Sequence, residues 1–321
     1  IVMKILFITS SRIGDAVLST GLLDHIAHTY PNAKVTIACG PLCTSLFEGY
    51  PLLDKIIPLK KEKRHKHWVK LWKQVIGTKW DMVIDLRDSA VSRLIRTKKR
   101  FVHSRHIDKG LHKVEQNAAV MGLNPPPSPN LWFTADQKKK AADLIPDNTK
   151  VLAVGPTANW IGKTWPPERF VDVINFMTAK DGILPDAPVA VFAAPGEEEN
   201  AYHVLNSMPA DRQIDVIAKT DPGTAAAALS RCAFYLGNDS GLMHCAAAAV
   251  VPTVGVFGPS YPHIYSPWGA HTAYARTPES FDELIDFDGY NPKTLDRTLM
   301  TSLGTTTVIE LIKGFSAKKA A

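Results

Sequence analysis

The first half of the chain alternates short apolar runs with stretches of helical periodicity. Apolar runs typical of buried parallel strands occur at 4–9, 34–38, 55–59 and 80–85. Between these runs, the spacing of apolar residues predicts helices over 16–30, 42–47 and 66–76. Strands that alternate with helices in this way indicate a doubly wound α/β domain.

The second half has the same alternation. It predicts strands at 151–154, 187–192, 234–237 and 253–257, and helices near 136–144, 168–178, 197–207, 224–230 and 241–250. A proline-rich stretch, NPPPSP at 124–129, precedes this half. Because consecutive prolines cannot continue a helix or a sheet, we place a linker near 124–130.

Length and composition fit two domains. A chain of 321 residues is about twice the usual domain size. With 45% hydrophobic and 21% charged residues it has enough apolar material for two cores. We therefore predict domains 1–148 and 149–321, both Rossmann-like, with a ligand cleft between them.

We expect no targeting or anchoring segment in this sequence. None of its apolar runs reaches the roughly 20 residues of a membrane span. The run at 3–10 lacks a basic flank and a cleavage site, so we interpret it as a strand and expect a cytoplasmic protein. The cysteines have no metal-ligand spacing, which favours reduced, buried thiols: Cys39, Cys43, Cys232 and Cys245.

The net charge of +6 indicates an anionic partner, which leaves nucleic acid, a membrane surface or a phosphorylated substrate. The densest basic stretch is 60–70, and a second lies at 93–100. No nucleic-acid-binding motif accompanies either stretch, which argues against nucleic acid. The stretch at 60–70 is also compatible with a solvated helix face. Its candidate binding residues are Lys61, Lys63, Arg64 and Lys66.

Candidate chemistry follows the predicted strands, where ligands bind in parallel sheets. The turn 10–15 lacks the G-x-G-x-x-G fingerprint of NAD-binding proteins. It ends in Asp15 at the start of a helix, where a carboxylate serves either as a cap or as a catalytic base.

Two later turns are candidate phosphate sites. The loop 155–166 combines a glycine with Thr157 and Lys163, although an ordinary surface loop has the same composition. The turn 237–244 leads into an alanine-rich helix, so that the amides of Ser240 and Gly241 would form an anion site. His244 follows as a proton carrier, a phosphate ligand or a structural residue.

Taken together, these motifs resemble the ADP-heptose:lipopolysaccharide heptosyltransferases, glycosyltransferase family 9. The resemblance covers nearly all of the chain and is most specific at 238–244 and 256–260. It also includes the opening 3–18, the Lys-Thr-Trp-Pro loop at 163–166 and the acidic loop 196–199. It implies the GT-B fold and an inverting, metal-independent transferase that needs no cofactor.

The resemblance also implies roles. Asp15 would be the general base, and Lys163 with Thr157 and the amides of Ser240 and Gly241 would bind the donor diphosphate. Glu197 or Glu198 would bind the ribose, and Asp239 and His244 complete the donor motif. The residues Lys61, Lys63, Arg64 and Lys66 would meet the phosphates or Kdo carboxylates of a lipopolysaccharide acceptor at the inner face of the inner membrane.

Some positions depart from the family pattern. Thr164 replaces a basic residue, 155–157 differ from the usual Pro-Gly-Ala, and 281–303 have no clear match. A related glycosyltransferase with another nucleotide sugar and acceptor therefore remains an alternative. A periplasmic binding protein also has two α/β lobes, but we find no signal peptide. The triplet 286–288 matches a D-x-D metal motif, which we interpret as surface.

Overall fold

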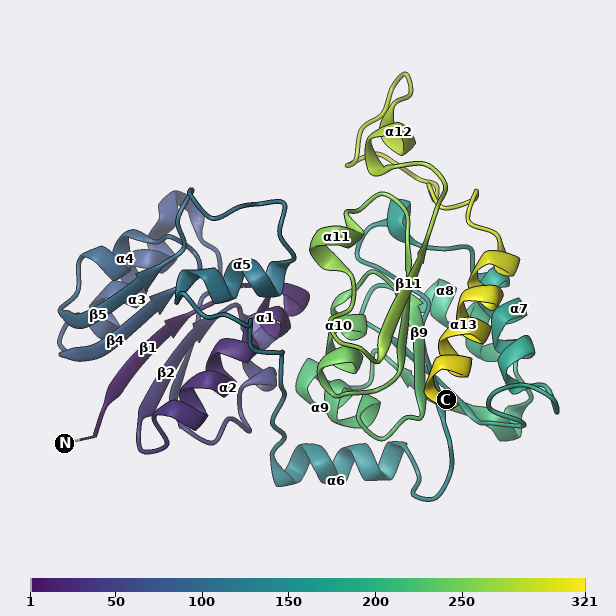
Figure 1. Ribbon diagram of the computed structural model, residues 1–321, viewed down its shortest axis with the longest axis horizontal. Helices are drawn as coiled ribbons and strands as arrows, with labels where there is room; N and C mark the ends of the chain where they lie inside the picture. The colour runs from purple at the N-terminus through teal and green to yellow at the C-terminus, as the bar shows by residue number, and fades with distance from the viewer. Residues whose placement is uncertain (1, 321) are drawn as a thin grey trace. The chain divides into compact units, whose positions relative to one another are not determined.

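The computed structural model describes residues 2–320 and divides into two compact units (Figure 1). The first comprises the chain up to Gln137 together with Asp221–Thr224, and the second comprises Lys138–Thr220 and the chain from Ala225 onward. Each unit is a parallel sheet with helices on both faces, as the alternation of strands and helices predicted. Among residues 2–320, no helix has both the length and the apolar character to cross a membrane.

The sheet of the first unit has the strand order β3-β2-β1-β4-β5, and all neighbours are parallel. The central strand β1 pairs with β2 on one side and with β4 on the other. The order therefore reverses between β1 and β4, and such a switch point is where open α/β sheets bind ligands. The strands are β1 (Lys4–Ile8), β2 (Lys34–Cys39), β3 (Leu53–Pro58), β4 (Trp80–Asp85) and β5 (Thr97–Val102).

Two helices occupy the region in which one was predicted. The helix is interrupted at Ser19, which ends α1 (Ile13–Leu18) and precedes α2 (Thr20–Thr29). The predicted basic helix is α3 (Lys66–Val75), whose Leu71 and Val75 are buried against one face of the sheet. The remaining elements are short helices: 3-10 turns at Pro41–Leu46 and Lys63–His65, α4 (Ala90–Arg93) and α5 (Lys113–Val120).

The sheet of the second unit has the order β11-β10-β9-β6-β7-β8. Counted from its own first strand, this is 6-5-4-1-2-3, the strand order of dinucleotide-binding folds. Its switch point lies between β6 and β9. The strands are β6 (Leu152–Gly155), β7 (Val189–Ala193), β8 (Gln213–Ile217), β9 (Phe234–Asn238), β10 (Thr253–Phe257) and β11 (Thr272–Arg276).

Helices cover both faces of this second sheet. Figure 1 shows α9 (Pro222–Leu229) and α10 (Gly241–Ala248) on one face, and α7 (Pro167–Thr178), α8 (Glu198–Asn206) and α13 (Thr305–Ala320) on the other. Trp165 and Phe170 are fully buried in the core of this unit, with their rings edge to face. The other helices are α6 (Ala135–Leu144), α11 (Pro262–Tyr265) and α12 (Phe281–Ile285).

The proline-rich segment lies against α2. The amide of Asn130 donates to the Thr20 hydroxyl at 3.0 Å, and the Asn130 side chain donates to Asp24 at 2.8 Å. A Cβ on Gly21 would lie 2.3 Å from the carbonyl oxygen of Pro127, so only glycine permits this approach. The segment is thus part of the first unit, and the two units divide after Gln137.

The cysteine side chains are all buried, as the sequence predicted. Burial raises the pKa of Cys43 to about 12, and the nearby Asp15 carboxylate adds to the shift. Burial also raises the pKa of Cys232 to about 12. Thiols with such pKa values stay protonated at neutral pH and have little nucleophilic reactivity.

Candidate functional site

Asp15 is the third residue of α1, directly after the central strand β1. The N-cap of this helix is Arg12, in extended conformation, so the interpretation of Asp15 as the cap is wrong. Asp15 is partly buried, and in the described part of the chain its carboxylate accepts no hydrogen bond. The carboxylate is therefore available for contact with a ligand.

A cavity of about 640 Å³ lies at the carboxyl edge of the first sheet and is lined in part by Asp15. Residues that follow β1 and β4 form two of its walls, as expected at a switch point. Its cationic lining residues are Arg12, Lys61, Arg87 and Lys113. His65 and His67 also line it. Several cations around a single carboxylate suit a ligand with more than one anionic group.

Of the four basic residues predicted to bind an anionic ligand, only Lys61 lines this cavity. Lys63, Arg64 and Lys66 are exposed and lie outside the cavity lining. The chain turns sharply here, because Arg64 and His65 both have left-handed backbone angles, with φ of 54° and 57°. One of the four candidate residues thus lines the cavity, and the other three form an exposed outer group.

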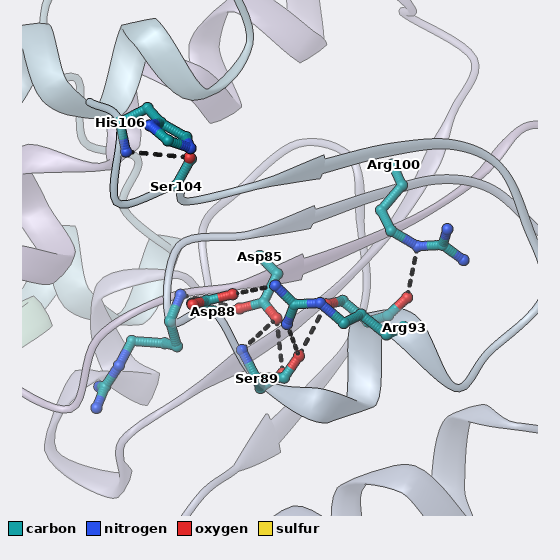
Figure 2. Close-up of polar contacts among 9 residues, drawn as sticks. Asp85, Asp88, Ser89, Arg93, Arg100, Ser104 and His106 are labelled. Atoms are coloured by element: carbon teal, nitrogen blue, oxygen red, sulfur yellow. Dashed lines mark hydrogen bonds and ion pairs between the residues drawn. The ribbon is translucent and has the colours of Figure 1, made fainter.

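A buried carboxylate fixes the turn that carries Arg87. Asp85 ends β4 and is fully buried. It accepts hydrogen bonds from the amide of Arg87 at 2.9 Å and from the amide and hydroxyl of Ser89 at 2.8 and 2.6 Å (Figure 2). Arg93 braces the same turn by pairing with Asp88 and by donating to the carbonyl of Ser89. Arg87 therefore belongs to a turn that these hydrogen bonds hold fixed at the edge of the cavity.

The second unit brings Lys163 and Asp239 together at its own switch point. Lys163 lies in the loop after β6, and Asp239 directly follows β9. The Lys163 Nζ is 3.2 Å from the Asp239 Oδ2 and donates to the Asp239 carbonyl at 3.3 Å. His244, on α10, approaches the other carboxylate oxygen at 4.0 Å. Three predicted site residues thus form one charged cluster.

Two further predicted residues meet elsewhere in the second unit. The Thr157 hydroxyl donates to the Glu197 carboxylate at 2.6 Å, although 40 residues separate the two in sequence. Glu198 begins α8 and accepts a hydrogen bond from the amide of Gly196 at 2.9 Å. This hydrogen bond lowers the pKa of Glu198. The acidic loop is therefore ordered next to the loop after β6.

Two glycines and a tyrosine pack together in β6 and β9, just before α10. Ser240 is the N-cap and Gly241 the first helical residue, while the Ser240 side chain makes no capping hydrogen bond. The buried Tyr235 hydroxyl lies where a Cβ on Gly155 or Gly237 would collide, at 2.1 and 2.4 Å. Glycine at both positions lets the tyrosine fill the space beneath the turn.

Within the described part of the chain, no group of three or more His, Cys, Asp and Glu side chains is arranged to hold a metal ion. The D-x-D triplet follows α12, and its Asp286 and Asp288 are both exposed.

Comparison with known proteins identifies the family. Residues 68–283 match the model of glycosyltransferase family 9 (heptosyltransferase). The chain is 24% identical to lipooligosaccharide heptosyltransferase 2 of Campylobacter jejuni over 83% of this chain and 85% of that protein. It is 22% identical to lipopolysaccharide heptosyltransferase 2 of Salmonella typhimurium over 92% and 95% of the two chains.

Solved structures show the same fold. The E. coli ADP-heptose lps heptosyltransferase II matches with a TM-score of 0.74 at 20% identity, over 99% of this chain and 100% of that chain. The E. coli heptosyltransferase WaaC with ADP matches with a TM-score of 0.72 at 18% identity, over 98% and 100%. The predicted GT-B fold is therefore confirmed. Because the family match spans more than half of the sequence, the chain belongs to glycosyltransferase family 9, the heptosyltransferases.

Proposed function

We propose that the protein transfers heptose from ADP-heptose to the Kdo/lipid A inner core of lipopolysaccharide, with inversion at the anomeric carbon. The observation that carries this proposal is the position of Asp15, whose unbonded carboxylate lines a cavity with four cationic side chains. A candidate base in the same cavity as several cationic side chains suits an acceptor that has both a hydroxyl and anionic groups.

The first unit would hold this acceptor. Arg12, Lys61, Arg87 and Lys113 would bind its phosphates or Kdo carboxylates, and Asp15 would take the proton of the attacking hydroxyl. A carboxylate is a weak base, so the rate depends on how closely the bound hydroxyl is held to Asp15. The exposed Lys63, Arg64 and Lys66 would attract the acceptor from a distance.

The second unit would hold the donor. Lys163, the Thr157 hydroxyl and the amides of Ser240 and Gly241 would contact the diphosphate, while Glu197 or Glu198 would bind ribose hydroxyls. As the acceptor oxygen bonds to the anomeric carbon, the bond from that carbon to the β-phosphate oxygen breaks. Its electron pair leaves with ADP, and Lys163 stabilises the added negative charge.

We also place the protein in the cytoplasm, at the inner face of the inner membrane. The exposed face of α3 supports this, because Val69 is accessible between Lys66, Lys70 and Lys73. Basic side chains near an anionic leaflet each contribute about 1 kcal/mol to binding. A basic face on the unit that holds the acceptor would bring this unit to the membrane in which the lipid-linked acceptor lies.

The decisive experiment is turnover of ADP-heptose with purified lipid A carrying defined Kdo residues. We expect ADP release and a product of inverted anomeric configuration by NMR, while Asp15→Asn forms both products at least about a hundredfold more slowly. ADP-glucose, UDP-sugars and GDP-sugars in parallel reactions test the alternative of another nucleotide sugar. Faster transfer from any of these donors, or a product of retained configuration, would contradict the proposal.

A further inference from the structure

Residues 291–303 cross over the loop that carries Lys163, and we call this segment the strap. It lies beyond residue 283, where the family match ends, and in a region where the sequence motifs assign no role. It belongs to the same compact unit as the loop. The segment is irregular and connects α12 with α13 (Figure 1).

The strap bonds to the backbone on both sides of Lys163. The amide of Leu299 donates to the carbonyl of Gly162 at 3.1 Å. The hydroxyl of Thr298 donates to the carbonyl of Thr164 at 2.6 Å. The backbone carbonyls of the residues directly before and after Lys163 are therefore both held from outside the loop.

A third hydrogen bond joins the strap to Trp160, which precedes Lys163 in the loop. The Trp160 indole N–H donates to the Pro292 carbonyl at 3.0 Å. A Cβ on Gly162 would lie 2.8 Å from the Trp160 ring and 3.0 Å from the Leu295 side chain. Glycine at 162 thus lets the strap and the loop pack in direct contact.

The far end of the strap is fixed in the core. Met300 is fully buried, and the Leu303 carbonyl accepts hydrogen bonds from the Trp165 indole at 2.9 Å and from Arg169. The Ser302 hydroxyl instead donates to the Glu279 carboxylate. The strap is therefore fixed at one end in the core, and its Thr298 and Leu299 hold the loop through their hydrogen bonds.

Apart from Asp239, Lys163 depends on its own short turn, in which its amide bonds to the Trp160 carbonyl at 3.1 Å. We propose that the strap is a positioning element of the donor site, in which Thr298 acts on the donor phosphates through Lys163. This inference rests on the proposed function, because it takes the ligand of Lys163 to be the diphosphate of ADP.

The test compares ADP affinity by calorimetry in the full-length protein. Thr298→Val keeps the shape of the side chain but removes its hydroxyl, which donates to the Thr164 carbonyl and accepts from the Met300 amide at 3.0 Å. We expect ADP affinity to fall roughly threefold to tenfold, as for the loss of the one hydrogen bond that reaches the loop. Thr298→Ser should restore it. Ser302→Ala, in the same strap but bonded to Glu279, is the matched control and should bind ADP like the wild type.

A double-mutant cycle separates positioning from a general loss of structure. In a Lys163→Ala background, Thr298→Val should cause no further loss of ADP affinity, because the residue through which it acts is gone. An equal loss in both backgrounds, or wild-type affinity in Thr298→Val, would overturn the inference while leaving the proposed donor intact. A wild-type protein that binds no ADP would overturn the proposed donor, and the inference with it.

Discussion

Lys163 and Asp239 form an ion pair between two loops that follow neighbouring strands, with 3.2 Å between Nζ and Oδ2. The side chains are only 23% and 10% exposed, so water screens the pair weakly. Asp239 thereby fixes the position of the lysine in the free protein. A bound phosphate can then share the Lys163 charge without first ordering a flexible side chain.

The first prediction concerns this pair. Lys163→Ala should weaken ADP binding about tenfold to over a hundredfold, because a charge-assisted hydrogen bond contributes roughly 1.5 to 3 kcal/mol. It should also lower the Tm, since it leaves the buried Asp239 carboxylate without its cation. Calorimetry and thermal unfolding measure the two effects.

Asp239→Asn is the informative comparison, because it removes the pair but keeps the lysine. Its Tm should be lower than that of the wild type. Its ADP affinity should stay higher than that of Lys163→Ala. Normal ADP binding by a folded Lys163→Ala protein would show that the loop after β6 does not bind the donor phosphates.

The second prediction concerns Asp15, the proposed base. Asp15→Asn should reduce kcat roughly 10² to 10⁴-fold, because the amide cannot accept the hydroxyl proton. ADP affinity should be unchanged, since the predicted donor residues belong to the other compact unit. The control is Asp54→Asn, which replaces an exposed carboxylate on β3 of the same unit. It should change neither kcat nor ADP affinity. A kcat within a few-fold of the wild type would exclude Asp15 as the base.

The central strands of both sheets were predictable, because strands buried on both faces are continuously apolar. The strands β5, β8 and β11 were not predicted, and all three lie at sheet edges. Their sequences, TKKRFV, QIDVI and TAYAR, mix polar and apolar residues as partly solvated edge strands do. The pattern at 93–100 therefore indicated a basic patch where the structure has part of a strand.

Candidate site residues could be named from the sequence where they follow one strand, as at Asp15, Lys163 and Asp239, and their roles stay predictions. Arg87 and Lys113 were missed, because they reach the Asp15 cavity only through the sheet order and the turn held by Asp85. One signal was present: Asp85 ends an apolar strand immediately before an arginine, and parallel sheets place such turns side by side. The strap has no comparable signal, since its contacts are mostly backbone groups.

The third prediction separates the cavity from the outer basic residues. Arg87→Ala should raise the acceptor KM about tenfold or more, as for one charge-assisted contact, with ADP affinity unchanged. Lys61→Ala should act in the same direction. A triple variant with alanine at Lys63, Arg64 and Lys66 should change the acceptor KM less at high salt than at low salt, because exposed charges act over distance and are screened. Steady-state kinetics at two salt concentrations measures both effects.

Arg87→Lys offers a finer test of the same cavity. Lysine keeps the charge but lacks the planar fork of arginine, so it should recover only part of the acceptor KM. If the triple variant lost more acceptor binding than Arg87→Ala at every salt concentration, the acceptor site would lie outside the cavity.

The last prediction concerns pH and stability in the first unit. Asp81, on β4, joins three strands, because its carboxylate accepts from the backbone amide of Lys4 on β1 at 2.8 Å and pairs with Lys98 on β5 at 2.6 Å. The hydrogen bond from Lys98 lowers the pKa of Asp81, and the Lys4 amide lowers it further. A depressed carboxylate pKa stabilises the fold above the unfolded-state value, near 3.9, and this contribution is lost as pH falls through the folded-state pKa.

Asp81→Asn should therefore lower the Tm at pH 7, and the difference from the wild type should shrink as the pH falls below about 4. Thermal unfolding from pH 7 to pH 2 measures this difference directly. Lys98→Met should reproduce only part of the loss at pH 7, because the Lys4 amide still bonds to Asp81 and the lysine is largely exposed. A Tm difference for Asp81→Asn that stays constant down to pH 2 would show that Asp81 acts through its shape and not through its charge.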